Sequence, residues 1–492
     1  MEPLYLGVDL STQKLKAVVI NSKLEFVEEV SVDYDEELPG FGTTNGANVD
    51  PNNPHRITSP VEMWLKAVDL LLQKLKHSKA FDFHQIAGIS GCAQQHGTVY
   101  WNNEAIEALE HLERDLSLQS QLKDGFALEN SPIWMDSSTT AECKQFEDCV
   151  GGAENLSQLT GSRAYHRFSG PQILKIFNDS PEVYHQSERI SLISSFLSSL
   201  FVGKVVGIEV CDASGMNLME LRTKRWSDRL VNLVDSTLAD KLGKIEDSDQ
   251  RWSISHYHVL KYGFNPTCQV TAFTGDNPSA LIGMGIKPGD MGISLGTSDT
   301  VFLTLDDYDS CLEGHIFVNP IDRSTFMGML CFKNGSLQTP SGNNGNIGFY
   351  FDKHEILPDH RSGVFRFDAR GRKVDAFDAK TEIRAVFEHQ CLAKRLYAEK
   401  FGFGGHQGRL ILTGGASNNR DLQQMLANVF GRDAFVCGMT EAAAVGGALR
   451  AMPDQNHEIS LERASEPEKS AVEVYNGMIE VYKKLQSEMT ND

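Results

Sequence analysis

The stretch LGVDLSTQKLKAV, residues 6–18, has a counterpart past the middle of the chain, MGISLGTSDTVFL, residues 291–303. In both stretches an apolar strand leads into a short polar turn and a second strand, and the matching glycines and threonines keep the same offset without a gap. A hairpin of this kind is common, but the constant register favours two related domains. We therefore expect an α/β chain built from two such domains, with a ligand in the cleft between them.

Length and composition agree with a globular chain of two domains or more. The chain has 492 residues, too many for one core. Its formal net charge of −20 argues against nucleic acid and anionic membranes as partners. The nine cysteines include no CxxC pair, which indicates a reduced protein without a cysteine metal site. With no signal peptide at its start, we expect a cytoplasmic protein.

Hydrophobic periodicity places the main elements. The run 191–210 is the most apolar, but it carries Lys204 and Glu209, so we predict a buried helix and a strand rather than a membrane span. We predict strands at 4–10, 16–20, 25–32, 85–90, 98–101, 268–273 and 409–415, and helices at 60–78 (with Pro60 in its first turn), 416–431 (closed by Gly431), 440–452 and 465–489. The Ala- and Gly-rich helix at 440–452 has the composition for close packing against backbone.

The first polar turn, from Asp9 to Thr12, places an acid at the end of a buried strand. Backbone amides and hydroxyls in such a turn can hold phosphate oxygens, and the acid can take a metal ion through water. Taken alone, the turn is better explained as the closure of a hairpin. The similar turn at Gly296, Thr297 and Ser298 favours the interpretation that two such turns hold one nucleotide.

The stretch TGDNPSA, residues 274–280, joins a predicted strand to a helix. Asn277 and Pro278 are explained as a helix start, with Asn277 just before the helix. Asp276 is left over at the carboxyl end of a strand, where ligands bind in α/β sheets and where a carboxylate can accept a proton from a substrate hydroxyl. A second, alternative cap is an equally good interpretation from the local pattern.

Three further motifs are weaker. The turn 91–97 offers Gln94, Gln95 and His96 to a polyol, or else holds a histidine that the turn itself satisfies. Arg163 and Arg167 would share one face if their segment is helical, either toward a ligand or toward solvent. The turn 413–419 joins glycines to a helix start, which suits an approaching anion but also a plain strand-to-helix connection.

The order of these motifs resembles that of the FGGY carbohydrate kinases, and within them most closely the eukaryotic D-xylulose kinases. The likeness covers nearly the whole chain, and QQHG, WMDSS and TGDNP together are a specific combination. It rests on the segments 5–13, 91–101, 134–143, 160–168, 212–221, 273–284, 294–303, 313–320 and 412–431.

The resemblance implies a fold and an activity. The fold would be α/β, with two actin-like (ribonuclease H-like) ATPase domains flanking a deep cleft, residues 1–272 for the sugar and 273–492 for ATP. The activity would be the ATP-dependent phosphorylation of D-xylulose to D-xylulose 5-phosphate in pentose metabolism, with Mg²⁺. The partners would be the sugar and ATP.

The resemblance also implies roles for single residues, carried over position by position. Asp276 matches the catalytic base and also a sugar contact, beside the sugar-contacting positions His96, Arg167 and Asn277. The nucleotide and phosphate positions are Asp9 (also near Mg²⁺), Thr12, Gly296, Thr297, Gly414, Gly415 and Asn418.

The sequence departs from the family's pattern in one place. Between the segments 331–337 and 345–351, family members carry a helical segment that helps form the nucleotide side of the cleft, and here only QTPSGNN, residues 338–344, lies there. There are two rival hypotheses, the first because of this departure and the second because the sequence discriminates weakly between sugars that differ in the placement of one hydroxyl. One is a sugar-binding or weakly active protein with an impaired ATP site, and the other is a kinase for another ketose or a polyol.

Overall fold

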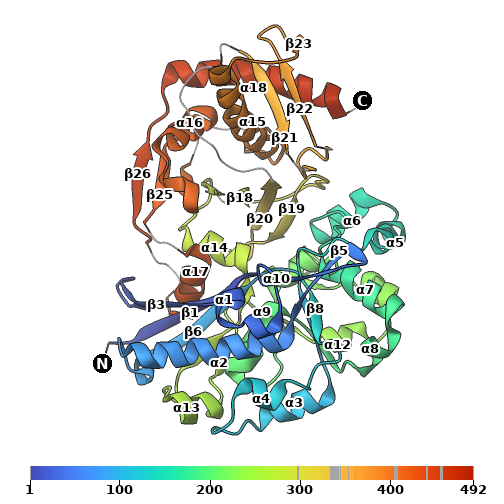
Figure 1. The fold of residues 1–492 in the computed structure, drawn as a ribbon, viewed down its shortest axis with the longest axis vertical. Helices are drawn as coiled ribbons and strands as arrows, with labels where there is room; N and C mark the ends of the chain where they lie inside the picture. Colours follow the sequence, from blue (N-terminus) through green and yellow to red (C-terminus); the bar gives the residue numbers. More distant parts are fainter. Residues whose placement is uncertain are drawn as a thin grey trace. The chain divides into compact units, whose positions relative to one another are not determined.

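The computed structural model of the chain divides into two compact units (Figure 1). Unit 1 comprises residues 1–283, 317–323 and 441–457, and unit 2 comprises 284–316, 324–440 and 458–492. The structure describes residues 2–295, 299–332, 343, 345–352, 354–360, 362–403, 408–438, 441–454 and 458–490.

A seven-stranded sheet organises unit 1, in the order β14-β15-β6-β1-β2-β3, with β16 beside β6. Strand β1 is buried along its whole length, as expected for a central strand covered on both faces. It pairs antiparallel with β2 and parallel with β6. The strands are β1 (Leu4–Leu10), β2 (Lys14–Asn21), β3 (Phe26–Asp33), β6 (Ile86–Ala93), β14 (Arg251–Ser253), β15 (Gln269–Thr271) and β16 (Thr274–Gly275).

A second seven-stranded sheet organises unit 2, in the order β19-β20-β18-β17-β24-β25-β26. Its strands are β17 (Met291–Ser294), β18 (Asp299–Leu305), β19 (His315–Val318), β20 (Phe326–Phe332), β24 (Leu410–Thr413), β25 (Ala434–Cys437) and β26 (Leu461–Ser465). A smaller sheet holds β21 (Ile347–Phe351), β22 (Gly363–Phe367) and β23 (Lys373–Val374).

The two large sheets share one topology. In unit 1 the series β3-β2-β1 is antiparallel and β1-β6-β15 is parallel. In unit 2 the series β20-β18-β17 is antiparallel and β17-β24-β25 is parallel. The predicted duplication is therefore confirmed in the strand order. The turn 296–298, which belongs to the second hairpin, lies outside the described residues.

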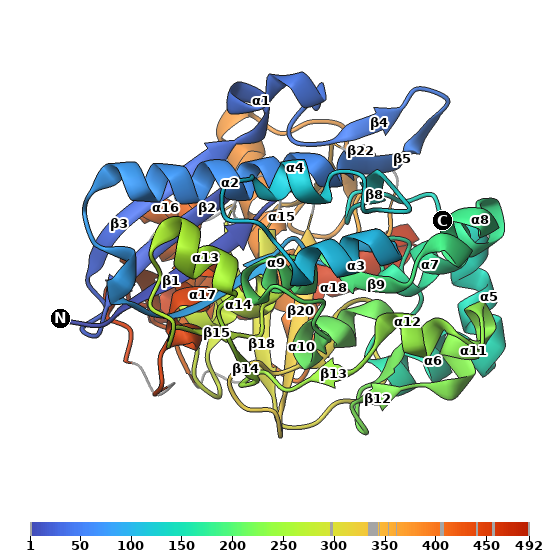
Figure 2. The same ribbon diagram turned by 90° about the horizontal axis from the view of Figure 1, so that it is seen from below.

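Helices and short strands complete unit 1, and α2 packs on β2 and β3 (Figure 2). The fully buried helix α9 precedes the short strand β10, as predicted for 191–210. The helices are α1 (Tyr34–Glu37), α2 (Val61–Ser78), α3 (Asn103–Glu110), α4 (Leu118–Leu122), α5 (Thr140–Val150), α6 (Ala153–Thr160), α7 (Ser169–Asp179), α8 (Pro181–Gln186), α9 (Ile193–Val202), α10 (Val210–Ala213), α11 (Asp228–Val234), α12 (Leu238–Leu242), α13 (His256–Tyr262), α14 (Asp276–Gly283) and α17 (Ala442–Ala451), with 3-10 turns η1 (Pro39–Phe41), η2 (Phe83–Gln85) and η3 (Ser214–Met216). The short strands are β4 (Asn48–Asp50), β5 (Asn53–Pro60), β7 (Thr98–Trp101), β8 (Asn130–Pro132), β9 (Arg189–Leu192), β10 (Ile208–Glu209), β11 (Met219–Glu220), β12 (Arg225–Trp226) and β13 (Ile245–Glu246).

Helix α17 packs against β1, β6 and α14 at backbone distance (Figure 1). A Cβ atom added at Gly7 of β1 would stand 2.0 Å from the carbonyl oxygen of Ala444, and one added at Gly446 would stand 1.9 Å from that of Ser279 in α14. Small residues are thus required on both sides of this contact. The close packing predicted for 440–452 is confirmed.

Three helices cover the sheets of unit 2, namely α15 (Ala379–Lys400), α16 (Arg420–Phe430) and α18 (Lys469–Thr490), with the 3-10 turn η4 (Gly415–Asn418).

Two predicted boundaries were wrong. The helix predicted from 416 begins at Arg420, because η4 takes the preceding residues and Asn419 caps the helix. The last helix begins at Lys469, because 461–465 pair as β26 with β25.

Pro60 was also misplaced by the prediction. It is the residue before α2 rather than a residue of its first turn, and its backbone is extended. Within the parts of the chain that the structure describes, we find no helix that has both the length and the apolar character needed to cross a bilayer.

Candidate active site

Strand register brings two of the predicted acids to one edge of the unit 1 sheet. Asp9 of β1 and Thr274 of β16 both pair with Cys92 of β6, which lies between them in a parallel arrangement. The residues that follow these positions therefore leave the sheet at the same carboxyl edge. Asp276 is the second residue after Thr274, so it emerges beside the turn that follows Asp9.

Asp276 is the first residue of α14, and its neighbour Asn277 is the second. The prediction that Asn277 stands just before the helix is therefore wrong, because the helix already begins at Asp276. Asp276 Oδ1 instead accepts a hydrogen bond from the backbone amide of Asn277 at 2.9 Å and from its Nδ2 at 3.1 Å. The carboxylate thus stands at the helix start with one oxygen engaged locally.

Burial dominates the electrostatics of both acids. Burial, followed by the neighbouring charge of Asp9, raises the pKa of Asp276 to about 8, although hydrogen bonds from the backbone of Asn277 and Gln95 act in the opposite direction. Burial also raises the pKa of Asp9, while a hydrogen bond from Ser11 Oγ to Asp9 Oδ2 at 2.6 Å opposes that change. A carboxyl group with a pKa near neutrality suits proton transfer at that pH.

Thr12 and Arg167 meet through a tryptophan. The indole Nε1 of Trp134 donates to Thr12 Oγ1 at 2.8 Å. The guanidinium of Arg167 lies over the Trp134 ring at 5.0 Å from its centroid, a cation–π contact. Thr12 Oγ1 in turn donates to Gln94 Oε1 at 3.4 Å. The first polar turn and the predicted sugar-side arginine are therefore joined by direct contacts.

His96 is held firmly in the same region. Its backbone is in the left-handed region with φ of 72°, which is uncommon for a residue other than glycine. Its Nδ1 lies 3.0 Å from the carbonyl oxygen of Gly215, so Nδ1 carries the proton in that contact. Its ring packs on Phe168 at 4.5 Å, and Ser169 Oγ donates to its carbonyl oxygen at 2.8 Å. A backbone strain with this much support is common at binding sites.

The two arginines of the segment 160–168 do not act as a pair. The segment lies between α6 and α7 and is not helical, because Gly161 ends α6 in the left-handed conformation. Arg163 is exposed and pairs with Glu147 at 3.2 Å. The expectation of a shared helix face was therefore wrong, and Arg167 alone reaches the site.

The predicted nucleotide-contacting residues belong to unit 2. Gly414 has a φ of 89°, and a Cβ atom there would stand 2.3 Å from the carbonyl oxygen of Leu295, so the fold itself requires glycine. Gly415 is different, since an added Cβ atom would meet nothing within 4 Å. Gly415 and Asn418 are both exposed on η4. The predicted phosphate residues Gly296 and Thr297 lie outside the described residues.

Asp212 was not selected from the sequence, and Gln95 was named there only as a weak candidate in the turn 91–97. Gln95 Oε1 accepts a hydrogen bond from Asn277 Nδ2 at 3.0 Å, and Gln95 Nε2 donates to Asp212 Oδ1 at 3.3 Å. Both residues lie in segments that carried the family resemblance. Their contact spans 117 positions of the sequence, a distance that motif spacing cannot bridge.

The residues present fit a magnesium ion that is coordinated mainly by phosphate oxygens and water, with one carboxylate from the protein. Mg²⁺ usually takes one or two protein carboxylates together with water and phosphate oxygens. Asp9 supplies one such carboxylate, to which the hydroxyl of Ser11 donates at 2.6 Å. The described residues hold no cluster of three or more His, Cys, Asp or Glu side chains arranged for a metal.

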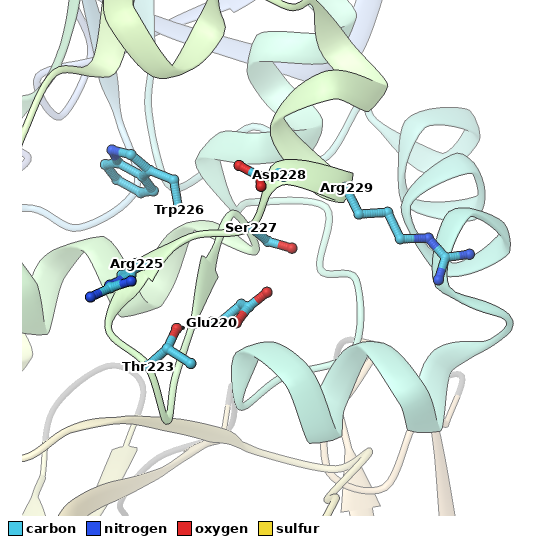
Figure 3. A pocket seen from close by; sticks show the side chains of 7 residues that line it. All are labelled: Glu220, Thr223, Arg225, Trp226, Ser227, Asp228 and Arg229. Carbon is cyan, nitrogen blue, oxygen red and sulfur yellow. Dashed lines mark hydrogen bonds between the residues drawn. The ribbon is translucent and has the colours of Figure 1, made fainter.

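A surface hollow of about 790 Å³ lies elsewhere in unit 1, around the β11–β12 hairpin and the start of α11 (Figure 3). None of the predicted site residues lines it. Its lining includes charged side chains of both signs. The lining residues are Glu220, Thr223, Arg225, Trp226, Ser227, Asp228 and Arg229.

Comparison with known families matches both parts of the chain. The description "FGGY family of carbohydrate kinases, N-terminal domain" matches residues 122–283, and the corresponding C-terminal domain matches residues 356–453. The xylulose kinase of Rattus norvegicus is 47% identical over 470 residues, which cover 91% of this chain and 87% of that protein. Xylulose kinase 2 of Arabidopsis thaliana is 42% identical over 485 residues, with coverage of 92% and 87%.

Solved structures agree on the fold. A ligand-bound xylulose kinase from Lactobacillus acidophilus matches with a TM-score of 0.81 and 17% identity, covering 99% of this chain and 98% of that one. Plasmodium falciparum glycerol kinase with ADP matches with a TM-score of 0.76 and 16% identity, covering 98% of each chain. The predicted fold class is therefore confirmed.

Proposed function

Because this chain belongs to the FGGY family of carbohydrate kinases, ATP-dependent sugar kinases, we propose that it transfers the terminal phosphoryl group of ATP to D-xylulose and gives D-xylulose 5-phosphate and ADP. The observation that carries the proposal is the carboxylate of Asp276. It stands at a helix start on the carboxyl edge of the sheet, with a pKa of about 8 and with the amide of Asn277 beside it.

Asp276 acts as the general base in this proposal. It accepts the proton of the sugar's terminal hydroxyl while that oxygen forms its bond to the terminal phosphorus of ATP and the bond from phosphorus to ADP breaks. Its raised pKa makes the carboxylate a stronger base than an exposed aspartate, which favours this transfer near neutral pH.

Three residues of unit 1 bind the sugar. His96 and Arg167 are each fixed by aromatic neighbours, which lowers the entropic cost of placing them against a ligand. Asn277 offers its amide next to the base. Arg167 makes a cation–π contact with Trp134, whose indole also donates to Thr12. The proposed sugar-binding residue Arg167 and the proposed phosphate-binding residue Thr12 are therefore connected through one side chain.

The phosphate groups meet the turn of Asp9 and Thr12 in unit 1. Asp9 would hold Mg²⁺, which when bound neutralises charge on the phosphate oxygens. In unit 2, Gly414, Gly415 and Asn418 contact the nucleotide, and Gly296 and Thr297 contact its phosphates.

The rival hypothesis of a sugar-binding protein depends on the shortened segment 338–344, of which the structure describes only Asn343. Calorimetry separates the two hypotheses. The kinase binds both D-xylulose and ATP, whereas the rival binds the sugar alone. The cytoplasmic location expected from the sequence stays a prediction.

The experiment that tests the proposal is a coupled assay of ADP release with a panel of ketoses and polyols. We expect D-xylulose to give the highest kcat/KM. A higher value for D-ribulose or for a polyol would reassign the substrate, and no sugar-dependent ADP release from any of them would overturn the kinase activity.

A further inference from the structure

Asp212 of α10 is a buried acid to which the proposed function gives no role. Its side chain is 1% exposed. Asp212 Oδ2 accepts a hydrogen bond from Ser194 Oγ at 2.5 Å, and Asp212 Oδ1 accepts one from Gln95 Nε2 at 3.3 Å. Burying a carboxylate is costly, so a fold that keeps one here needs its partners to compensate.

The backbone next to Asp276 makes room for this contact. A Cβ atom at Gly275 would stand 2.4 Å from Gln95 Cγ and 2.8 Å from Asp212 Oδ1. Glycine at this position therefore allows the acid and the amide to approach the residue immediately before Asp276. The contact between Asp212 and Gln95 is built into the site.

The contacts continue from Gln95 to the predicted sugar contact. Gln95 Oε1 accepts from Asn277 Nδ2 at 3.0 Å, and the same Nδ2 donates to Asp276 Oδ1 at 3.1 Å. Asp212, Gln95 and Asn277 therefore form a chain of hydrogen bonds that ends at the proposed base.

The chain has one polarity while Asp212 is ionised or carries its proton on Oδ2. A carboxylate only accepts hydrogen bonds, so Gln95 must turn its NH₂ group toward Asp212 and its oxygen toward Asn277. A proton on Oδ2 of Asp212 would be donated toward Ser194 and would leave Oδ1 an acceptor. Asn277 must then donate to Gln95 with its NH₂ group. Its Oδ1 accepts no hydrogen bond within the part of the chain that the structure describes.

We propose that Asp212 is a positioning residue, which fixes the orientation of the Gln95 amide and through it that of Asn277, so that Asn277 Oδ1 accepts a hydrogen bond from one hydroxyl of the sugar. The inference rests on the proposed function, because it requires Asn277 to contact the sugar. It deepens that function by assigning the direction of one hydrogen bond in substrate recognition.

The test compares Asp212→Asn with the unchanged protein by calorimetry, using D-xylulose and its monodeoxy analogues. Asparagine can turn either its oxygen or its NH₂ group toward Gln95, so Gln95 no longer enforces one orientation of Asn277, and only the contact of its Nδ2 with Asp276 Oδ1 still favours that orientation. We expect binding of D-xylulose to weaken about three- to tenfold, the range for one hydrogen bond, and KM for the sugar to rise while KM for ATP stays. One analogue, which lacks the hydroxyl that meets Asn277, will bind both proteins equally well.

Ser194→Ala is the matched control. It removes a hydrogen bond from the same carboxylate but leaves an acceptor facing Gln95, so the pattern across the analogues stays that of the unchanged protein. Gln95→Leu is a second variant in case Asp212→Asn does not fold. It removes the acceptor at Gln95 Oε1, so that only Asp276 Oδ1 still holds the Asn277 amide, and it will reproduce the single insensitive analogue.

Two results would overturn the inference. Either Asp212→Asn weakens the binding of every analogue by the same factor, which is the signature of a merely structural role, or it leaves sugar binding unchanged. Failure of the sugar site on which the inference rests looks different, because the unchanged protein itself would then bind none of these sugars. Failure of the kinase activity alone appears separately, as sugar binding without sugar-dependent release of ADP.

Discussion

Three aspartates determine the electrostatics of the candidate site, and each has a different environment. Asp9 lies near the end of a buried strand and accepts a hydrogen bond from Ser11, Asp212 is buried with donors on both oxygens, and Asp276 stands at a helix start. Asp276 is affected by both others, since the charges of Asp9 and Asp212 each raise its pKa. A pKa that neighbouring charges shift strongly is a usual basis for assigning a general base.

The raised pKa of Asp276 predicts how stability changes with pH in the ligand-free protein. The pKa is about 8 in the folded chain and roughly 3.9 when unfolded, so the folded chain binds the proton more tightly. The stability that this group contributes is therefore fully present below about pH 4 and is lost as pH rises through 8.

Asp276→Asn does not titrate at this position. We compare the unfolding temperatures of the unchanged protein and of this variant at each pH. We expect the unfolding temperature of the unchanged protein to fall by several degrees more than that of the variant between pH 5 and pH 9. The pKa of Asp212, raised to about 7 by burial, affects both proteins and so largely cancels in the comparison. Unfolding temperatures that run parallel over this range would contradict the raised pKa.

Among the elements, α17 shows how closely composition can dictate packing. Its glycines and alanines let it meet β1 and α14 at backbone distance. The composition alone was enough to predict this helix and its manner of packing. It did not reveal which elements α17 packs against, because those contacts join residues far apart in the chain.

Gly446→Ala tests this packing, with Gly477→Ala as its control. The new methyl group at 446 would stand 1.9 Å from the carbonyl oxygen of Ser279, so we expect the unfolding temperature to fall by several degrees. Gly477 lies in α18 with nothing within 4 Å of an added Cβ atom. Alanine there is expected to stabilise the helix by about 0.5–1 kcal/mol. Equal effects of the two substitutions would contradict the account.

The turn after β24 allows a folding role to be separated from a ligand role. Gly414→Ala would force a left-handed backbone and a contact of 2.3 Å with Leu295, and we expect it to destabilise the protein. Gly415→Ala meets no protein atom within 4 Å, so we expect an unchanged unfolding temperature and a KM for ATP raised about tenfold or more. An unchanged KM for ATP in Gly415→Ala would remove this glycine from the nucleotide site.

At the scale of the whole molecule, two units with one strand order carry the candidate residues. The duplicated hairpin predicted this from the sequence, because strand order follows from a repeated pattern of apolar strand, turn and strand. The helix start at Asp276, the pairing of Arg163 with Glu147 and the chain from Asp212 to Asn277 were not predictable in the same way. They depend on tertiary contacts, since neither local propensity nor motif spacing specifies which distant side chain fills a site.

The central claim is that Asp276 is the base for phosphoryl transfer to D-xylulose. The most direct test follows formation of the sugar phosphate by ³¹P NMR with ATP, Mg²⁺ and D-xylulose. Three proteins are compared, namely the unchanged chain, Asp276→Asn, and the control Asp228→Asn, whose carboxylate lies at the surface hollow of unit 1.

We expect D-xylulose 5-phosphate from the unchanged chain and at a similar rate from Asp228→Asn. From Asp276→Asn we expect kcat to be lower by about 10²–10⁴-fold, while calorimetry still detects sugar binding. Near-normal formation of the sugar phosphate by Asp276→Asn would contradict the claim.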